Sequence, residues 1–181
     1  MKIPKTIKIN KCRLCFNKKL TPIYKFGSQF VSNFVNKKDI KKGIKAPLNL
    51  VYCKNCKLLQ LEHSAPQEIM YKKFYWYRSS VTSTMINALK DIHTTVKKLS
   101  ILKKHDTVLD IGANDGTLLK FFKKDGFKTV GCEPAKNLAK DLKKNCDYVL
   151  NDFWDLKKLN KIIKKKQHKK TQTNYSYRYV L

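Results

Sequence analysis

The feature that most constrains the fold of this chain is an alternation of predicted strands and helices near its end. Strands are predicted at residues 107–112, 128–133 and 147–151, and the helical segments 115–126 and 135–145 separate them. A helix between two strands carries the chain back across the sheet, so that successive strands run parallel. We therefore predict an α/β fold with a parallel sheet and crossover helices.

The loop after the first of these strands, "DIGANDGT", has the character of a ligand-binding turn. Gly112 directly follows the strand and Gly116 stands where the helix begins, so the backbone can turn tightly and a ligand can approach it closely. Glu133 follows the second strand, 21 residues after Gly112, where a carboxylate can accept hydrogen bonds from a ribose. Together these features indicate a cofactor that contains a nucleoside.

The acids around the glycines favour one cofactor. Asp110 and Asp115 would repel a pyrophosphate, whereas S-adenosylmethionine has no phosphate and carries an ammonium and a sulfonium group. A nicotinamide dinucleotide is the weaker candidate, and a P-loop is excluded because no Gly-Lys-Ser/Thr follows. The alternative is an ordinary strand-to-helix turn capped by Asn114 and Asp115.

Two Cys-x-x-Cys pairs near the start of the chain predict a zinc site. Cys12 and Cys15 form the first pair, and Cys53 and Cys56 form the second on a hairpin-like knuckle between strand-like pieces. Four thiolates suit tetrahedral zinc and leave no open position, so we expect a structural ion. The alternatives are a redox motif or small core residues. Lysines that would offset the thiolate charge stand at positions 11, 18, 54 and 57, and we expect Cys132 and Cys146 to be packed or free thiols.

Between the cysteine pairs and the alternating region the sequence predicts two helices. Pro66 opens a short one, and a longer one follows "YWYRSS", with Ser79 or Ser80 as the N-cap. Its apolar residues recur every three or four positions, and His93 lies beside this stripe, where we expect a structural or solvated role. The stripe consists of Val81, Met85, Ala88, Leu89, Ile92, Val96 and Leu99.

The formal net charge of +27 raises the question of nucleic-acid binding. The cations are almost all lysine, with Arg13, Arg78 and Arg178 as the only arginines, and they are spread over the whole chain. Specific recognition of bases and phosphates relies more on arginine, so a solvated lysine surface is the favoured interpretation. The sequence also shows no secretory signal and no apolar stretch that would span a bilayer, so we expect a cytoplasmic protein.

Three segments together resemble one enzyme family. They are the pairs "CRLC" and "CKNC", the stretch "YKKFYWYRSSVTSTM", and "VLDIGANDGTLLKFF" followed by "VGCEPAKNLA". They are similar to bacterial zinc-containing, S-adenosylmethionine-dependent C-methyltransferases, over roughly residues 10 to 155. The best understood members methylate a carbon of nucleotide-linked keto sugars. The resemblance implies zinc, S-adenosylmethionine, a small-molecule substrate and a Rossmann-like class I methyltransferase domain.

The resemblance also implies site residues. The cysteines named above would hold zinc. The positions that match the family's cofactor site are Asp110, Gly112, Asn114, Asp115, Gly116, Thr117, Glu133, Pro134, Ala135, Asp152 and Phe153. The aromatic segment near cofactor and substrate is matched by Tyr75, Tyr77, Arg78 and Ser79, for which packing between the lobes is the alternative. No position matches the family's general base, so the catalytic residues are unknown.

We expect four parts in the chain: a zinc-binding lobe (1–65), a helical connector (66–104), a partial cofactor-binding domain (105–155) and an atypical basic tail (156–181). The sequence ends about thirty residues after the third predicted strand, which leaves the sheet of such a domain partial. We expect a frameshift or premature stop near residue 165, which sequencing of the downstream DNA would test. The alternative function is a noncatalytic zinc-binding module that contacts nucleic acid or protein through its lysines.

Overall fold

The fold is given by a computed structural model that describes residues 6–31, 37–72, 75–99, 102–103 and 106–167. The chain divides into two compact units, Met1–Met70 and Tyr71–Leu181, which are described separately below. The final segment of the predicted tail, residues 168–181, lies outside the described residues.

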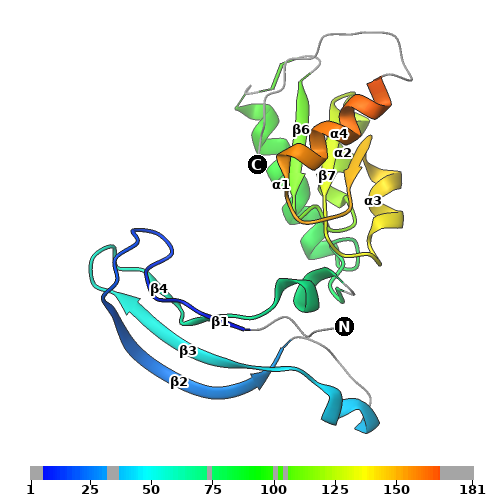
Figure 1. The fold of residues 1–181 in the computed structure, drawn as a ribbon. Coiled ribbons are helices and arrows are strands. Elements are labelled where there is room, and N and C mark those ends of the chain that lie inside the picture. Colours follow the sequence, from blue (N-terminus) through cyan, green and yellow to red (C-terminus); the bar gives the residue numbers. More distant parts are fainter. Residues whose placement is uncertain (1–5, 32–36, 73–74, 100–101, 104–105, 168–181) are drawn as a thin grey trace. The chain divides into compact units, whose positions relative to one another are not determined.

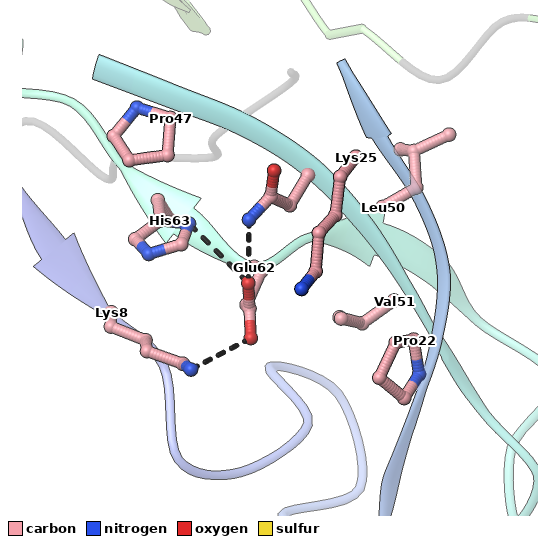
Figure 2. A pocket seen from close by; sticks show the side chains of 9 residues that line it. Lys8, Pro22, Lys25, Pro47, Leu50, Val51, Glu62 and His63 are labelled. Carbon is pink, nitrogen blue, oxygen red and sulfur yellow. Dashed lines mark hydrogen bonds and ion pairs between the residues drawn. The ribbon is translucent and has the colours of Figure 1, made fainter. Parts of the chain in front are cut away.

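The first unit consists of two small antiparallel sheets. The smaller sheet pairs β1 (Ile7–Lys8) with β5 (His63–Ser64), and the larger has the order β2-β3-β4, with bounds Leu20–Phe30, Lys45–Cys53 and Leu59–Leu61. A 3-10 helix, η1 (Lys37–Lys42), lies between β2 and β3 in the sequence. Figure 1 shows β2 and β3 as a long curved hairpin, and their register shifts at two places along β2. A cavity opens beside β1, β2 and β3 (Figure 2).

The second unit contains the predicted parallel sheet. Its elements are β6 (Thr107–Ile111), α2 (Thr117–Lys124), β7 (Lys128–Cys132), α3 (Ala139–Asn145), β8 (Tyr148–Leu150) and α4 (Leu156–Gln167). The strands are parallel in the order β6-β7-β8, so each predicted strand and helix of this region is present. This arrangement confirms the prediction of a partial Rossmann-like fold. Within the described residues, the outer edge of β6 has no partner strand.

Two apolar clusters hold this sheet between its helices. Neighbouring residues of a strand point to opposite faces, and Val108 accordingly belongs to one cluster and Leu109 to the other. The Val108 cluster includes Leu119 of α2 and Leu142 of α3, and the Leu109 cluster includes Leu159 of α4. Helices therefore cover both faces of the sheet (Figure 1), and its strand ends are left to carry polar residues.

The long helix before the sheet, α1 (Ser83–Lys98), differs from the prediction at its start. Its N-cap is Thr82, whose hydroxyl accepts a hydrogen bond from the Met85 N–H, so the predicted N-cap at Ser79 or Ser80 is wrong. The backbone N–H groups of those serines are instead bound by side chains of the loop after β6. No residue of α1 is fully buried, and Val96 of the apolar stripe packs, partly buried, against the Val108 cluster.

The short segment opened by Pro66 is helical, as predicted, and forms a π-helical turn, η2 (Glu68–Lys72). His93 of α1 has a structural role: its Nε2 lies 2.9 Å from Asp125 Oδ2, and its ring contacts Phe122 edge-on. Among the described residues, none of the helices has the length and apolar character needed to cross a bilayer.

Candidate functional site

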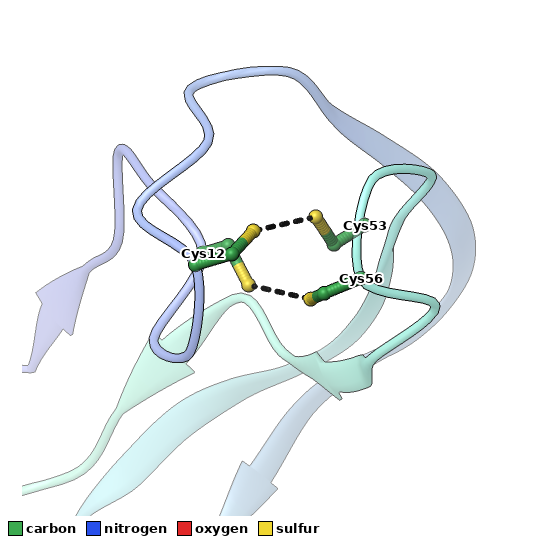
Figure 3. Close-up of side chains that lie close together, drawn as sticks. Cys12, Cys53 and Cys56 are labelled. Atoms are coloured by element: carbon green, nitrogen blue, oxygen red, sulfur yellow. Dashed lines mark hydrogen bonds between the residues drawn. The ribbon is translucent and has the colours of Figure 1, made fainter.

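The four predicted zinc ligands come together in the first unit. The Sγ atoms of Cys12, Cys15, Cys53 and Cys56 all lie within 4.8 Å of one another. The closest pairs, Cys12 with Cys56 and Cys15 with Cys53, are 3.5 Å apart, which is much too far for a disulfide (Figure 3). Tetrahedral zinc with Zn–S bonds of about 2.3 Å places its sulfurs about 3.8 Å apart, so the cluster fits zinc.

The two cysteine pairs have the same local backbone. In each knuckle the residue after the second cysteine, Phe16 or Lys57, has a positive φ, 58° and 63° respectively. The N–H of that residue donates to the carbonyl of the first cysteine, at 3.1 Å for Phe16 and 2.8 Å for Lys57. A left-handed conformation is unfavourable for such residues, and its occurrence at equivalent positions indicates that both loops are shaped to turn their sulfurs toward one point.

Hydrogen bonds to sulfur favour the thiolate form at two of the four cysteines. Backbone hydrogen bonding from Cys15 lowers the pKa of Cys12 to about 6, against the opposing effect of burial, and the Asn55 side chain contributes most to a lowered pKa of Cys15. Gln60 Nε2 also donates to Cys12 Sγ at 3.3 Å. At Cys56 a backbone hydrogen bond from Leu58 acts in the same direction, but burial and the other three cysteines raise the pKa to about 12. Asn55 and Gln60 were not found from the sequence, because nothing in the Cys-x-x-Cys spacing indicates which amide side chains support the sulfurs.

The second candidate site lies at the carboxyl ends of β6 and β7 in the second unit. Gly112 follows β6 with a φ of +85° and is held by an N–H bond to the Cys132 carbonyl at 2.8 Å. A Cβ added at Gly112 would meet no atom within 4 Å, so the loop is open at this point. The carboxylates of Asp110 and Glu133 belong to the same edge, and the charge of Glu133 acts on Asp110.

Glu133 is a buried carboxylate that organises this edge. Its Oε2 accepts the Asn114 N–H at 3.0 Å and its Oε1 accepts the Ala135 N–H at 2.8 Å, so it joins the loop after β6 to the turn after β7. Asn151 Nδ2 donates to the Glu133 carbonyl at 2.7 Å and braces the same turn. A carboxylate has about four acceptor positions, and two of those on Glu133 are not used by these backbone bonds.

Of these two acids, Asp110 is the one whose ionised form is disfavoured by its surroundings. Burial, and to a lesser degree the charge of Glu133, raise its pKa to about 6 from an ordinary value of 3.8. Its side chain makes no hydrogen bond among the described residues, so the cost of charging it is not offset within this unit. A cation placed at this edge would lower that cost, which makes Asp110 suited to a positively charged ligand.

Three further predicted cofactor residues direct their side chains into the protein. Asn114 Oδ1 accepts the Ser79 N–H at 3.0 Å, and its Nδ2 donates to the Tyr77 carbonyl at 3.1 Å. Asp115, which is 1% exposed, accepts the Ser80 N–H at 2.9 Å and the Thr117 hydroxyl at 2.6 Å. These bonds attach the segment after Tyr75 to the loop, so any contact of these residues with a ligand would be through the backbone.

The two glycines of the loop have different functions in the structure. A Cβ at Gly116 would lie 2.9 Å from Asn145 Cβ and 3.0 Å from Leu142 Cδ1, so this glycine permits α3 to pack against the start of α2. Gly112 has no such neighbour and alone provides open access. The pattern G-x-x-x-G therefore combines one packing glycine with one that a ligand can approach.

The remaining predicted cofactor residues are placed around the turn after β7 and the end of β8. Pro134 is partly buried, and Ala135 is fully buried, so the Ala135 side chain is not presented to a ligand. Asp152 is paired with Lys72 at 2.9 Å and with Lys158, and these lysines hold its pKa well below the usual range. Phe153 is partly buried, and the Lys72 ammonium lies 5.7 Å from its ring centre.

The aromatic segment is fixed within the second unit. Asn137 exchanges two hydrogen bonds with the backbone of Tyr75, both 3.0 Å long, and Arg78 forms an ion pair with Asp141. The Ser79 N–H binds Asn114, as described above, while the side chain of Tyr77 is 44% exposed. The segment therefore lies against the loop after β6 and the start of α3, and Tyr77 remains accessible.

Comparison with known proteins agrees with the zinc-binding cluster. Residues 12–71, which include all four clustered cysteines, match the family described as "Putative zinc binding domain". The C-methyltransferase NovU of Streptomyces niveus is 29% identical over 133 residues. That alignment covers 72% of this chain and 31% of the relative, so this chain spans about a third of the relative's length. The chain is thus similar to a C-methyltransferase, and residues 12–71 match a zinc-binding family. Its four-cysteine cluster is accordingly a zinc-binding site.

Proposed function

We propose that this chain forms the zinc-binding unit and the S-adenosylmethionine-binding part of a C-methyltransferase. The observation that carries the proposal is the pair of carboxylates, Asp110 and Glu133, beside the open Gly112 at the carboxyl ends of adjacent parallel strands. Ligands of open α/β sheets bind at this edge. The similarity to a C-methyltransferase supports the same assignment.

The charge of the site supports S-adenosylmethionine over a phosphate-containing cofactor. Two acids at one edge repel a pyrophosphate, whereas an ammonium and a sulfonium would offset the cost of ionising Asp110. Glu133 would use its free acceptor positions for the ribose hydroxyls, and the exposed Gly112 would allow close approach of the ligand to the backbone. When bound, S-adenosylmethionine supplies an electrophilic methyl group.

The substrate that we propose is a small molecule, in particular a nucleotide-linked keto sugar methylated at carbon. This part of the proposal rests on the resemblance of the sequence segments to that family. Removal of a proton next to the ketone requires a general base, and no residue of this chain is assigned to that role. The proposed contribution of this chain is therefore to bind and orient the methyl donor.

Titration calorimetry of the zinc-loaded chain with S-adenosylmethionine tests the proposal. Asp110→Asn keeps the shape of the side chain and removes its charge, and we expect it to weaken binding about tenfold, as for loss of one charge-assisted contact. Asp91→Asn is the matched control, because Asp91 is an exposed acid on α1 and its loss changes the net charge equally. Absence of saturable binding, or equal weakening by both variants, would refute the assignment and leave the noncatalytic zinc module as the alternative.

A further inference from the structure

The first unit contains a cavity that neither the zinc cluster nor the proposed cofactor site uses. Its volume is about 440 Å³, which is within the ~300–1,000 Å³ typical of small-ligand pockets. It lies where β1, β2, β3 and the start of β5 meet (Figure 2). Four of the residues that line it are apolar: Pro22, Pro47, Leu50 and Val51.

The one acid in the cavity is already neutralised. Glu62 accepts hydrogen bonds from Asn49 Nδ2 at 2.9 Å and Lys8 Nζ at 3.0 Å, and these two partners lower its pKa. Its backbone is fixed too, because the Glu62 N–H donates to the Asn49 carbonyl at 2.8 Å. Glu62 therefore positions Lys8 and Asn49 and does not add a free negative charge to the cavity.

Two nitrogen groups in the cavity have no interaction partner of the usual kind: Lys25 has no ion pair among the described residues, and His63 Nδ1 has no hydrogen bond. Lys25 lines the cavity from β2. His63 Nδ1 is buried, and Glu62 Oε2 is too far from it for a hydrogen bond, at 3.7 Å. Figure 2 shows Lys8, Lys25 and His63 around the Glu62 carboxylate. The cavity thus combines one ammonium group without an ion pair among the described residues, an unsatisfied nitrogen and apolar side chains.

We propose that this cavity binds a small phosphate ester, with the phosphate beside Lys25 and His63 and the apolar part of the ligand against Pro22, Leu50 and Val51. A phosphate monoester presents three strong acceptor oxygens, which can contact the Lys25 ammonium and the His63 nitrogen together, whereas a carboxylate presents two. Lysine ammonium groups bind phosphate as point charges and do not require the planar fork of arginine. The site is separate from the proposed cofactor site and does not depend on it.

A ¹H–¹⁵N NMR titration of the zinc-loaded chain tests the proposal with three probes. Phenyl phosphate carries both a phosphate and an apolar ring, inorganic phosphate lacks the ring, and phenol lacks the phosphate. We expect phenyl phosphate to give saturable shifts at the amides of Asn49, Leu50 and His63, with inorganic phosphate about threefold weaker for lack of the apolar contact. Phenol should give no saturable amide shifts at the same concentrations.

Matched lysine variants separate the cavity from general attraction by a basic protein. Lys25→Gln should weaken phenyl phosphate binding about fivefold, as for loss of one charged partner. Lys19→Gln removes an exposed lysine of the same unit outside the cavity and should change binding less than about twofold, because solvent screens distant charges. Equal loss in both variants, shifts confined to other residues, or phenol as strong as phenyl phosphate would overturn the proposal. None of these readouts involves S-adenosylmethionine.

Discussion

Replacing Asp110 by asparagine should make the ligand-free protein more stable. Burial and the charge of Glu133 raise the pKa of Asp110 to about 6, so near neutral pH the folded protein contains an ionised group in an unfavourable environment. The substitution removes that charge and keeps the size of the side chain. An acid that destabilises the fold while serving a ligand is typical of a functional site.

The magnitude follows from the pKa. The difference between about 6 and the ordinary value of 3.8 corresponds to about 3 kcal/mol, at ~1.36 kcal/mol for each pKa unit. The new amide also loses hydration on burial, at a cost of about 1 kcal/mol or more. We therefore expect Asp110→Asn to raise the free energy of unfolding by about 1–2 kcal/mol above pH 7.

The gain should depend on pH with a defined sign. Because the folded pKa of Asp110 is raised, the wild-type protein is relatively most stable below the unfolded pKa near 3.8 and loses stability as the pH rises through about 6. The variant has no such titration. Near pH 4 only the cost of burying the amide remains, so the variant should be less stable than wild type by about 1 kcal/mol. The variant should gain relative stability between pH 4 and 6, and the difference should level off above that range.

Tryptophan fluorescence during urea unfolding provides the assay. The chain has two tryptophans, Trp76 and Trp154, and both belong to the second unit, so the signal reports on the unit that contains Asp110. Asp91→Asn should show no comparable gain. An Asp110→Asn protein that is less stable than wild type at pH 7.5, or a difference that does not change between pH 4 and 7, would refute the reasoning.

Further predictions address other parts of the structure. Removal of zinc by a chelator should abolish the β-sheet circular dichroism of the first unit while tryptophan fluorescence persists, and a simultaneous loss of both signals would contradict separate units. Gly116→Ala should cost about 2–4 kcal/mol of unfolding free energy, because strain and a close contact add, whereas Gly126→Ala, with a similar φ and free space, should cost about 1 kcal/mol. Equal costs in urea unfolding would argue against the packing role of Gly116. Asn114→Gly keeps the positive φ but removes the side-chain bonds to Tyr77 and Ser79, and should accelerate hydrogen exchange at the Ser79 amide; unchanged exchange would contradict that attachment.

The sequence predicted those features that depend on local pattern. Buried parallel strands produce continuous apolar runs, and crossover helices have their own period, so each element between residues 107 and 151 was predicted. The cysteine spacing likewise predicted the cluster, since each pair forms its knuckle from neighbouring residues. The meeting of the two knuckles, whose sulfurs are 38 and 44 residues apart in sequence, was predicted from ligand chemistry, because tetrahedral zinc needs four thiolates.

Features set by contacts between distant residues were not predicted. Ser79 and Ser80 are good N-cap residues, but their N–H groups are bound by Asn114 and Asp115, and the helix begins after Thr82 instead. The internal role of those two loop side chains depends on partners 35 residues away in sequence. The amphipathic pattern of α1 indicated a helix correctly, whereas the partial burial of Val96 depends on the Val108 cluster of the later sheet.

The most direct test of the account is a ¹H–¹⁵N NMR titration of the zinc-loaded chain with S-adenosylmethionine. Binding at the carboxyl ends of β6 and β7 should produce the largest shifts at the amides of Gly112, Glu133 and Ala135, with little change in the first unit. Saturable binding that shifts other residues instead, or no shift at millimolar ligand, would contradict the central claim that this sheet edge holds the methyl donor.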